Sequence, residues 1–263
     1  MRRHIFPLIP VTLAVMAMSM SCTDFFSSSW ARWASRDPDK LIPAVTVGNV
    51  DDLKAKAENN PDLSLSVLKK IQDAANSATG SDKLKLQSAA LGAATNAVGL
   101  GQAVLGAAGA LTSLSGDPQT QIDDAKNMVL NAINSLQNLD AASTALVSIV
   151  PDPYDADGNI TPEFQAFSDT ASADDLAMAA AVLIAGQAKT YVNDAANSDD
   201  PADYIANLGD RIDGTSTDPL TDPENYARAM ALAAAAVNRS DELSGPLQDV
   251  LSGLNLASFN VNP

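Results

Sequence analysis

The sequence predicts an all-α protein of irregular stacked helix pairs, arranged as an α-solenoid or as a helical bundle. Apolar residues recur at the three- and four-residue spacing of helices, as in residues 63–78, and no alternating β-branched or aromatic run exceeds a few positions. Pairs of Asp, Asn or Thr with a following Pro recur along the chain. Such pairs mark helix starts, because the side chain caps free amides and Pro needs no amide partner. Ala-rich segments also recur, and their small side chains let helix backbones approach closely.

The boundaries of the expected helices follow from these pairs and from the apolar spacing. The pairs begin at Asp37, Asn60, Asp117, Asp152, Thr161, Asp200, Asp218 and Asp222. After a short helix near residue 37, we expect helices over residues 49–59, 63–78, 82–114 (broken near Gly99–Gly101), 118–139, 140–150, 162–168, 172–196, 201–212, 223–239 and 243–256. The Ala-rich segments are residues 88–111, 125–146, 177–196 and 227–237.

Residues 87–116 carry no charged side chain and are rich in Gly and Ala. Such a stretch suits either a hairpin that enters a membrane through GxxxG-like contacts or the buried centre of a helical body. Thr95, Asn96, Gln102 and the glycines make insertion into lipid costly. We therefore predict the buried centre.

The first residues have the layout of a secretory signal peptide. Two arginines precede an apolar run, and small residues lead to Cys22, the only cysteine of the chain. A lone thiol at this position predicts a lipid-modified N-terminus, with residues 1–21 removed as the signal peptide. The alternatives are a secretory signal cut elsewhere and an uncleaved anchor. An uncleaved anchor is disfavoured because roughly 20 apolar residues are needed to span a bilayer, and this run is shorter and is interrupted by Pro7 and Pro10. Around Cys22 the sequence resembles bacterial lipoproteins, and this resemblance implies a location in a bacterial cell envelope, on a membrane through acylated Cys22 and facing the periplasm.

Residues 22–48 form a predicted tether with an aromatic segment. Trp30 and Trp33, the only tryptophans, are spaced to lie on one side of a short helix. Their rings suit a membrane surface or a groove of the helical body, and both interpretations stay open. The predicted α-helical domain covers residues 49–258, and residues 259–263 form a tail.

The chain is strongly acidic, with a formal net charge of −16. Residues 22–126 hold 10 basic and 12 acidic residues, whereas residues 127–263 hold 4 basic and 20 acidic residues. An acidic surface repels nucleic acid and anionic headgroups, so we expect no nucleic-acid partner. The field of the C-terminal half either attracts a cation or a basic partner or serves solubility alone.

The residue types that remain after cleavage exclude several classes of catalysis. His4 is the only histidine and lies in the predicted signal peptide, and Cys22 is the predicted acylation site. Ser-His-Asp and Cys-His catalysis, histidine-ligated zinc and thiolate metal sites are therefore excluded. The carboxylate pairs Asp174–Asp175 and Asp199–Asp200 lie where helix-start charge is expected, and nothing places two of them across a cleft. We expect a protein that is not an enzyme and that has no cofactor, unless its carboxylates bind calcium.

Residues 152–164 are similar to an EF-hand calcium loop. Asp155, Asp157 and Glu163 supply oxygen atoms as candidate metal ligands, and Gly158 supplies the turn. The match is degenerate, because alignment on Gly158 places a proline at the first ligand position and Glu163 falls one residue early. The alternative, which we favour, is an Asp-Gly turn that leads into a threonine-capped helix.

Three features together resemble lipoproteins of spirochaetes. They are Cys22, the segment Ser-Ser-Ser-Trp30-Ala-Arg-Trp33-Ala-Ser-Arg-Asp37-Pro, and the helix Leu86-x-x-Ala89-Ala90-x-x-Ala93-Ala94. Among these lipoproteins, the chain is similar over residues 19–95 to the helical, tetratricopeptide-like lipoproteins that accompany TRAP-type solute transporters in treponemes. The resemblance implies a periplasmic scaffold that docks a solute-binding protein or screens a hydrophobic ligand, and it assigns no binding residue.

The sequence therefore predicts a membrane-anchored helical scaffold for protein interactions. Its partners would be the lipid membrane, through Cys22, and a protein of the envelope, and the resemblance adds a role as an accessory to solute transport. The alternative is a carrier of a small apolar ligand in a channel lined by the Ala-rich helices.

Overall fold

The computed structural model describes residues 42–101, 131–193 and 223–244. The chain divides into two compact units, Met1–Pro43 and Ala44–Pro263, and every described helix belongs to the second unit. Over the described ranges the regular structure is helical, and the one strand-like feature is an isolated bridge between Tyr154 and Ile160. The predicted all-α class is confirmed.

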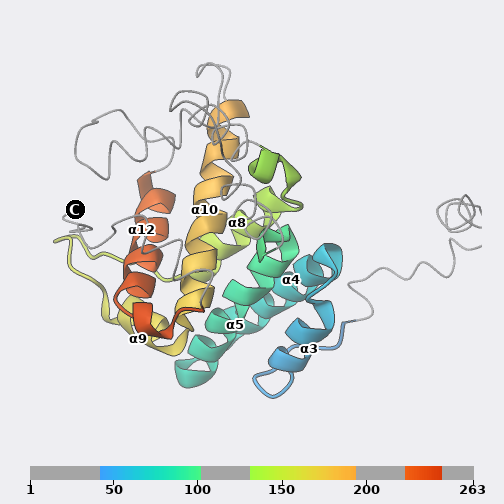
Figure 1. Ribbon diagram of the computed structural model, residues 1–263. Coiled ribbons are helices and arrows are strands. Elements are labelled where there is room, and N and C mark those ends of the chain that lie inside the picture. The colour runs from blue at the N-terminus through green and yellow to red at the C-terminus, as the bar shows by residue number, and fades with distance from the viewer. Residues whose placement is uncertain (1–41, 102–130, 194–222, 245–263) are drawn as a thin grey trace, which may run out of the picture. The chain divides into compact units, whose positions relative to one another are not determined.

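Seven α-helices and one short 3-10 helix make up the described part of the second unit (Figure 1). They are α3 (Val50–Ala57), α4 (Pro61–Ser77), α5 (Gly80–Val98), α8 (Leu139–Ile149), α9 (Pro162–Thr170), α10 (Ala173–Asn193), α12 (Pro223–Val237) and η2 (Ser240–Glu242). Each of these α-helices matches a predicted one, with ends that differ by a few residues. The helices predicted near residue 37 and over residues 201–212 lie outside the described residues.

Two of the predicted helix starts show the expected capping geometry. The Asn60 side chain accepts a hydrogen bond from the amide of Leu63 at 3.0 Å, and Thr161 Oγ1 accepts one from the amide of Phe164 at 3.2 Å. A proline follows each cap as the first helical residue, where its missing N–H costs nothing. The prediction for Asp152 is wrong, because residues 151–161 form a turn and the Asp152 carbonyl accepts a hydrogen bond from Thr161 Oγ1 at 2.6 Å.

The break predicted near Gly99–Gly101 is confirmed at the end of α5. Gly99 has a φ of +69°, in the left-handed region that glycine adopts without steric cost, and it forms the C-cap of the helix. Its amide donates hydrogen bonds to the carbonyls of Thr95 and Asn96, which lie in the last turn of α5. The rest of the predicted helix, from residue 102 onward, lies outside the described residues.

The helix expected to continue to residue 139 ends earlier, at residue 135, and Leu139 instead begins α8. Asn138, just before α8, has a φ of +50°. Its Nδ2 donates a hydrogen bond to the carbonyl of Ala97 at 3.3 Å, near the end of α5, where helix carbonyls lack intrahelical partners. The break is therefore fixed by a contact with a distant helix, which apolar spacing does not reveal.

The centre of the described helices is formed by α5 and α10. Helix α5 contacts α3, α4, α8, α9 and α10, and α10 also contacts α8, α12 and η2 (Figure 1). Because these two helices contact several others and not only their chain neighbours, the described helices form a bundle and not a linear stack. Within the described ranges, no helix is both long enough and apolar enough to cross a membrane.

The alanine-rich faces of the two central helices lie in the core. Every alanine between Leu86 and Val98 is buried, as are most alanines of α10. This confirms the buried centre for the described part of residues 87–116. Small side chains at these positions allow close helix approach, and Gly92 of α5 and Gly186 of α10 lie where a methyl group would meet a neighbouring helix.

Candidate functional site

Residues 150–161, here called the α8–α9 loop, form a tight turn around Asp155. The Asp155 Oδ1 atom accepts hydrogen bonds from the amides of Asp157 at 2.9 Å and Asn159 at 2.8 Å. The Asp155 carbonyl accepts one from the amide of Gly158 at 3.0 Å, and the φ of +80° at Gly158 closes the turn. The structure thus shows the Asp-Gly turn, and Thr161 caps the helix that follows.

These hydrogen bonds favour the ionised form of Asp155. The backbone amide of Asn159 contributes most, followed by its side chain and by the amides of Asp157 and Gly158, and together they lower the pKa of the Asp155 carboxyl group. Partial desolvation of the carboxylate raises its pKa, but this effect is smaller than the combined effect of the hydrogen bonds. Asp155 therefore acts as the acceptor that holds the turn together.

The structure does not gather the three candidate calcium ligands. Asp155 is occupied with backbone amides, Asp157 is exposed, and Glu163 lies in the first turn of α9, beyond the loop. Across residues 42–101, 131–193 and 223–244, no three acidic, His or Cys side chains are grouped so that they could hold a metal ion. Calcium binding by Asp155, Asp157 and Glu163 stays a prediction.

An ion pair joins the start of the α8–α9 loop to α12. The Arg228 guanidinium contacts the Asp152 carboxylate, and its Nη1 atom lies 3.9 Å from Glu224. The side chain of Arg228 is only 11% exposed, whereas those of Asp152 and Glu224 are 75% and 86% exposed. The Nε atom of Arg228 is buried and has no hydrogen-bond partner among the described residues. The cation is therefore largely buried beneath acids that remain in water.

A groove with a volume of 590 Å³ opens beside this ion pair. We call it the α5–α9 groove, because its walls come from the first turns of α5, the end of α8 with residues 150–152, and the first turns of α9. Its polar and charged lining comprises Lys83, Gln87, Ser148, Asp152, Glu163 and Arg228. Much of the remaining lining is apolar, from leucine, isoleucine, valine, proline and alanine.

Two polar contacts fix the back of the α5–α9 groove. The Gln87 side chain, buried on α5, donates a hydrogen bond to the carbonyl of Ile149 at 2.6 Å. Ser148 accepts a hydrogen bond at 2.6 Å from Gln72 of α4. By contrast, the exposed side chains of Lys83 and Glu163 have neither an ion pair nor a hydrogen bond within the described part of the chain. The groove therefore combines a fixed back with one exposed cation and one exposed anion that have no partner among the described residues.

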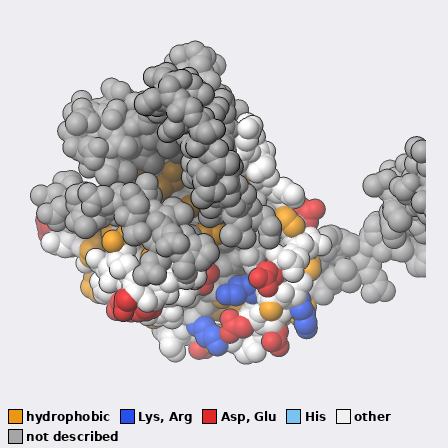
Figure 2. Space-filling model, in the orientation of Figure 1, with side chains coloured by type: hydrophobic (Ala, Val, Ile, Leu, Met, Phe, Trp, Pro, Cys, Tyr) orange, Lys and Arg blue, Asp and Glu red, His pale blue; other side chains and the backbone are white. Residues whose placement is uncertain are grey.

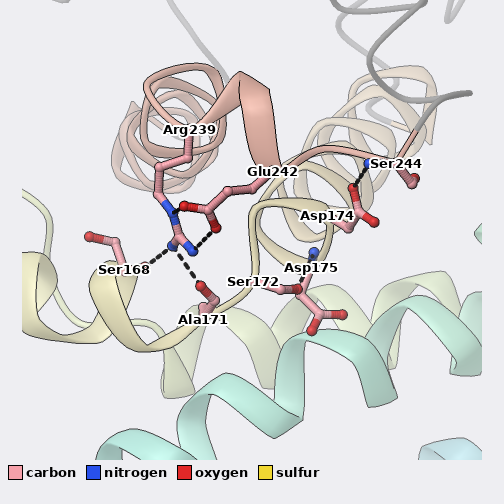
Figure 3. Close-up of polar contacts among 8 residues, drawn as sticks. All are labelled: Ser168, Ala171, Ser172, Asp174, Asp175, Arg239, Glu242 and Ser244. Carbon is pink, nitrogen blue, oxygen red and sulfur yellow. Dashed lines mark hydrogen bonds and ion pairs between the residues drawn. The ribbon is translucent and has the colours of Figure 1, made fainter.

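A second polar cluster joins α9, α10 and η2 (Figure 3). Arg239 donates hydrogen bonds to the carbonyls of Ser168 at 2.9 Å and Ala171 at 2.7 Å, at the C-terminal end of α9. Its guanidinium also pairs with Glu242, and the hydrogen bonds between the two raise the pKa of Arg239 and lower the pKa of Glu242. A cation at a helix C-terminus satisfies carbonyls that have no intrahelical partner, so the role of Arg239 is structural.

The predicted pair Asp174–Asp175 lies beside this cluster, and each residue takes part in one backbone hydrogen bond. Asp174 Oδ1 accepts a hydrogen bond from the amide of Ser244 at 2.8 Å, and the amide of Asp175 donates one to Ser172 Oγ at 3.1 Å (Figure 3). The Ser172 contact is local to the first turn of α10, as the helix-start interpretation expects, whereas the Asp174 contact joins α10 to the segment after η2. Ser244 itself is not helical, so the helix predicted to begin at residue 243 does not begin there.

Arg228 and Arg239 were not predicted from the sequence. Each has one acid nearby in the chain, Glu224 or Glu242, but their contacts with Asp152 and with the end of α9 join distant segments, which local patterns do not identify. The available signal was their scarcity, because residues 127–263 contain only four basic residues among 20 acidic ones. The remaining predicted site residues, Cys22 and Asp199–Asp200, lie outside the described residues.

No protein-family model, curated protein or solved structure matches this chain.

Proposed function

We propose that this protein is a membrane-anchored α-helical interaction module of the bacterial cell envelope, which binds a protein partner as an accessory to solute transport. The observation that carries the proposal is the α5–α9 groove. It is a solvent-open surface with an apolar lining and two charged side chains, Lys83 and Glu163, that have no partner within the described residues. Such a combination of apolar area with a few charged groups is typical of binding sites.

The packing of the central helices favours this proposal over a carrier of an apolar ligand. A carrier needs space between the Ala-rich helices, but the alanine faces of α5 and α10 are buried in the core. At Gly92 and Gly186, a single added methyl group would already approach a neighbouring side chain to 2.9 Å. Binding at the surface of the bundle requires no such opening.

The contacts of the carboxylates favour a binding role over catalysis. Asp155 and Asp174 accept hydrogen bonds from backbone amides, and Asp152 pairs with Arg228. A general acid or base needs a carboxyl group that is free to exchange a proton with substrate, which these groups are not. Together with the lack of histidine in residues 22–263, these contacts support our proposal that the protein is not an enzyme.

The N-terminal sequence supports the proposed anchor and location. The apolar run after two arginines, the small residues and Cys22 support lipid attachment at that cysteine. Metabolic labelling with an alkyne fatty acid tests this directly: the wild-type protein should carry the label in the membrane fraction, and Cys22→Ala should carry none. Labelling that persists in Cys22→Ala would overturn the anchor.

The interaction role is tested by a crosslinked pull-down of the full-length protein from the envelope of the cells that make it. Mass spectrometry should identify both bound proteins and extractable small molecules. The proposal expects one stoichiometric protein partner. A preparation without a protein partner but with a bound apolar molecule would overturn it and favour the carrier.

A further inference from the structure

We propose that the α5–α9 groove binds a basic and apolar peptide segment of the protein partner. This inference rests on the proposed function and specifies the partner surface that meets the groove.

The groove has the size and lining for a few peptide side chains. Its volume of 590 Å³ lies within the range of about 300–1,000 Å³ that is usual for ligand pockets. Leu84 is partly exposed on the α5 wall, and Pro162 and Ala166 are exposed on the α9 wall. An apolar side chain of the partner that packs between these walls would bury area on both molecules, which favours binding.

The exposed charge around the groove is mainly negative. Arg228 is largely buried and is paired with Asp152, so it presents little positive charge to a ligand. Asp152, Glu163 and the neighbouring Glu224 are all exposed. Lys83, on the α5 wall, is the one exposed cation among the described lining residues. A cation of the ligand is therefore favoured at the α9 wall and disfavoured at the α5 wall.

The charge of the whole C-terminal half adds to this local preference. Residues 127–263 hold 4 basic and 20 acidic residues, and they include the α8 and α9 walls of the groove. A field of one sign steers oppositely charged partners toward a surface and raises their association rate. Figure 2 shows acidic and basic side chains together on the described surface, and not a uniform acidic patch. The steering therefore comes from the net negative charge of the chain.

The recognition chemistry follows from these two walls. A Lys or Arg side chain of the partner pairs with the Glu163 carboxylate, which has no other partner within the described residues. An adjacent apolar side chain packs against Leu84 and Ala166. The charge contact gives orientation and the apolar contact gives most of the affinity.

A synthetic peptide with alternating Lys and Leu residues, labelled for fluorescence anisotropy, tests the inference. The peptide is titrated with the full-length protein in a nonionic detergent, and binding to empty micelles is measured as the blank. We expect Glu163→Gln to weaken binding about threefold to fivefold, as for loss of one exposed ion pair. Ala166→Phe fills the groove from an exposed position and should weaken binding by about tenfold, the effect of about 1.4 kcal/mol.

Glu58→Gln is the matched control. It removes the same charge from an exposed residue at the end of α3 that does not line the groove, and it should leave peptide binding unchanged. The inference is overturned if Glu58→Gln weakens binding as much as Glu163→Gln, or if Ala166→Phe has no effect. Equal binding of a peptide with Glu in place of Lys would also overturn it.

The pull-down separates this inference from the proposed function. If wild type and Ala166→Phe capture the same stoichiometric partner equally well, the groove is not the binding site, although the interaction module stands. If wild type captures no protein partner, the proposed function fails whatever the peptide does.

Discussion

Gly186 of α10 lies so close to Ser143 of α8 that a Cβ atom on the glycine would be 2.9 Å from both the Cβ and the Oγ atoms of the serine. The Cβ atom of Ser143 is fixed to its backbone, so it cannot rotate away. Gly92 of α5 differs, because an added Cβ atom there would meet Oδ1 of Asp175 at 2.9 Å and Nζ of Lys54 at 3.1 Å. These are the ends of flexible side chains, which can move.

We therefore expect the same change, from glycine to alanine, to affect stability differently at these two positions. Gly186→Ala should lower the free energy of unfolding by about 1–3 kcal/mol, because α8 and α10 must separate to admit the methyl group. Gly92→Ala should be neutral or stabilising, since alanine gains about 1 kcal/mol over glycine in a helix and the two side chains can shift. Urea denaturation followed by circular dichroism measures both values.

Ser143→Gly provides the matched rescue for Gly186→Ala. The double variant removes the obstructing Cβ atom and should recover part of the stability that Gly186→Ala loses. A larger loss for Gly92→Ala than for Gly186→Ala, or no rescue by Ser143→Gly, would show that close approach of α8 and α10 does not limit this position.

Because Arg228 is buried and Asp152 is exposed, we expect substitutions of these two residues to change the free energy of unfolding by different amounts. Arg228→Met should change the free energy of unfolding by less than about 1 kcal/mol, because it replaces a poorly satisfied buried cation by an apolar chain of similar length and leaves Asp152 solvated. Asp152→Asn should cost about 1–3 kcal/mol, because it leaves the buried guanidinium with the more distant Glu224 alone. Thermal and urea unfolding of both variants decide the order, and the reverse order would contradict this interpretation.

Arg239 should contribute to stability through the carbonyls at the end of α9. Arg239→Met leaves the carbonyls of Ser168 and Ala171 without these donors and should cost about 1–3 kcal/mol. The stability of Arg239→Lys should lie between those of wild type and Arg239→Met. A single ammonium group lacks the planar fork that donates to the two carbonyls through Nη1 and to Glu242 through Nε and Nη2. If Arg239→Lys and wild type are equally stable, charge alone and not the double contact accounts for the role of Arg239.

The lowered pKa of Asp155 predicts how the α8–α9 loop responds to acid. A carboxyl group whose pKa is lower in the folded loop than in the unfolded chain stabilises the loop at pH values above its unfolded pKa. That contribution is lost as the pH falls through the lower, folded pKa. The amide resonances of Asp157 and Asn159, followed by NMR, should therefore titrate with a midpoint below the ordinary value for aspartate.

Asp155→Asn is the control for this titration. The substitution keeps an oxygen acceptor but removes the charge, so the same two amides should no longer titrate in the acidic range. A midpoint at or above the ordinary aspartate value in the wild-type protein would contradict the hydrogen-bonded turn.

Local features of the sequence predicted the helices and several of their ends. Asn60 and Thr161 are followed by proline and cap α4 and α9, and Gly99 ends α5, because each of these signals acts within one turn of helix. The buried position of residues 87–101 also followed from their lack of charge.

Contacts between distant parts of the chain set the features that the sequence did not predict. Asn138 breaks the helix before α8 because it reaches the end of α5, and Asp152 lies in a loop that Arg228 joins to α12. The sequence did not predict the α5–α9 groove either, because Lys83 and Glu163 come together only after α5 and α9 have packed. Periodicity and capping describe single helices and carry no information on such pairs.

Photo-crosslinking from the groove in the native envelope tests the interaction module most directly. A photoreactive residue replaces Lys83, which lines the groove, or Lys85, an exposed lysine of the same helix that does not line it. Our account predicts an adduct with one envelope protein from position 83 and none from position 85. Equal adducts from both positions, or an adduct at position 83 with lipid alone, would contradict it.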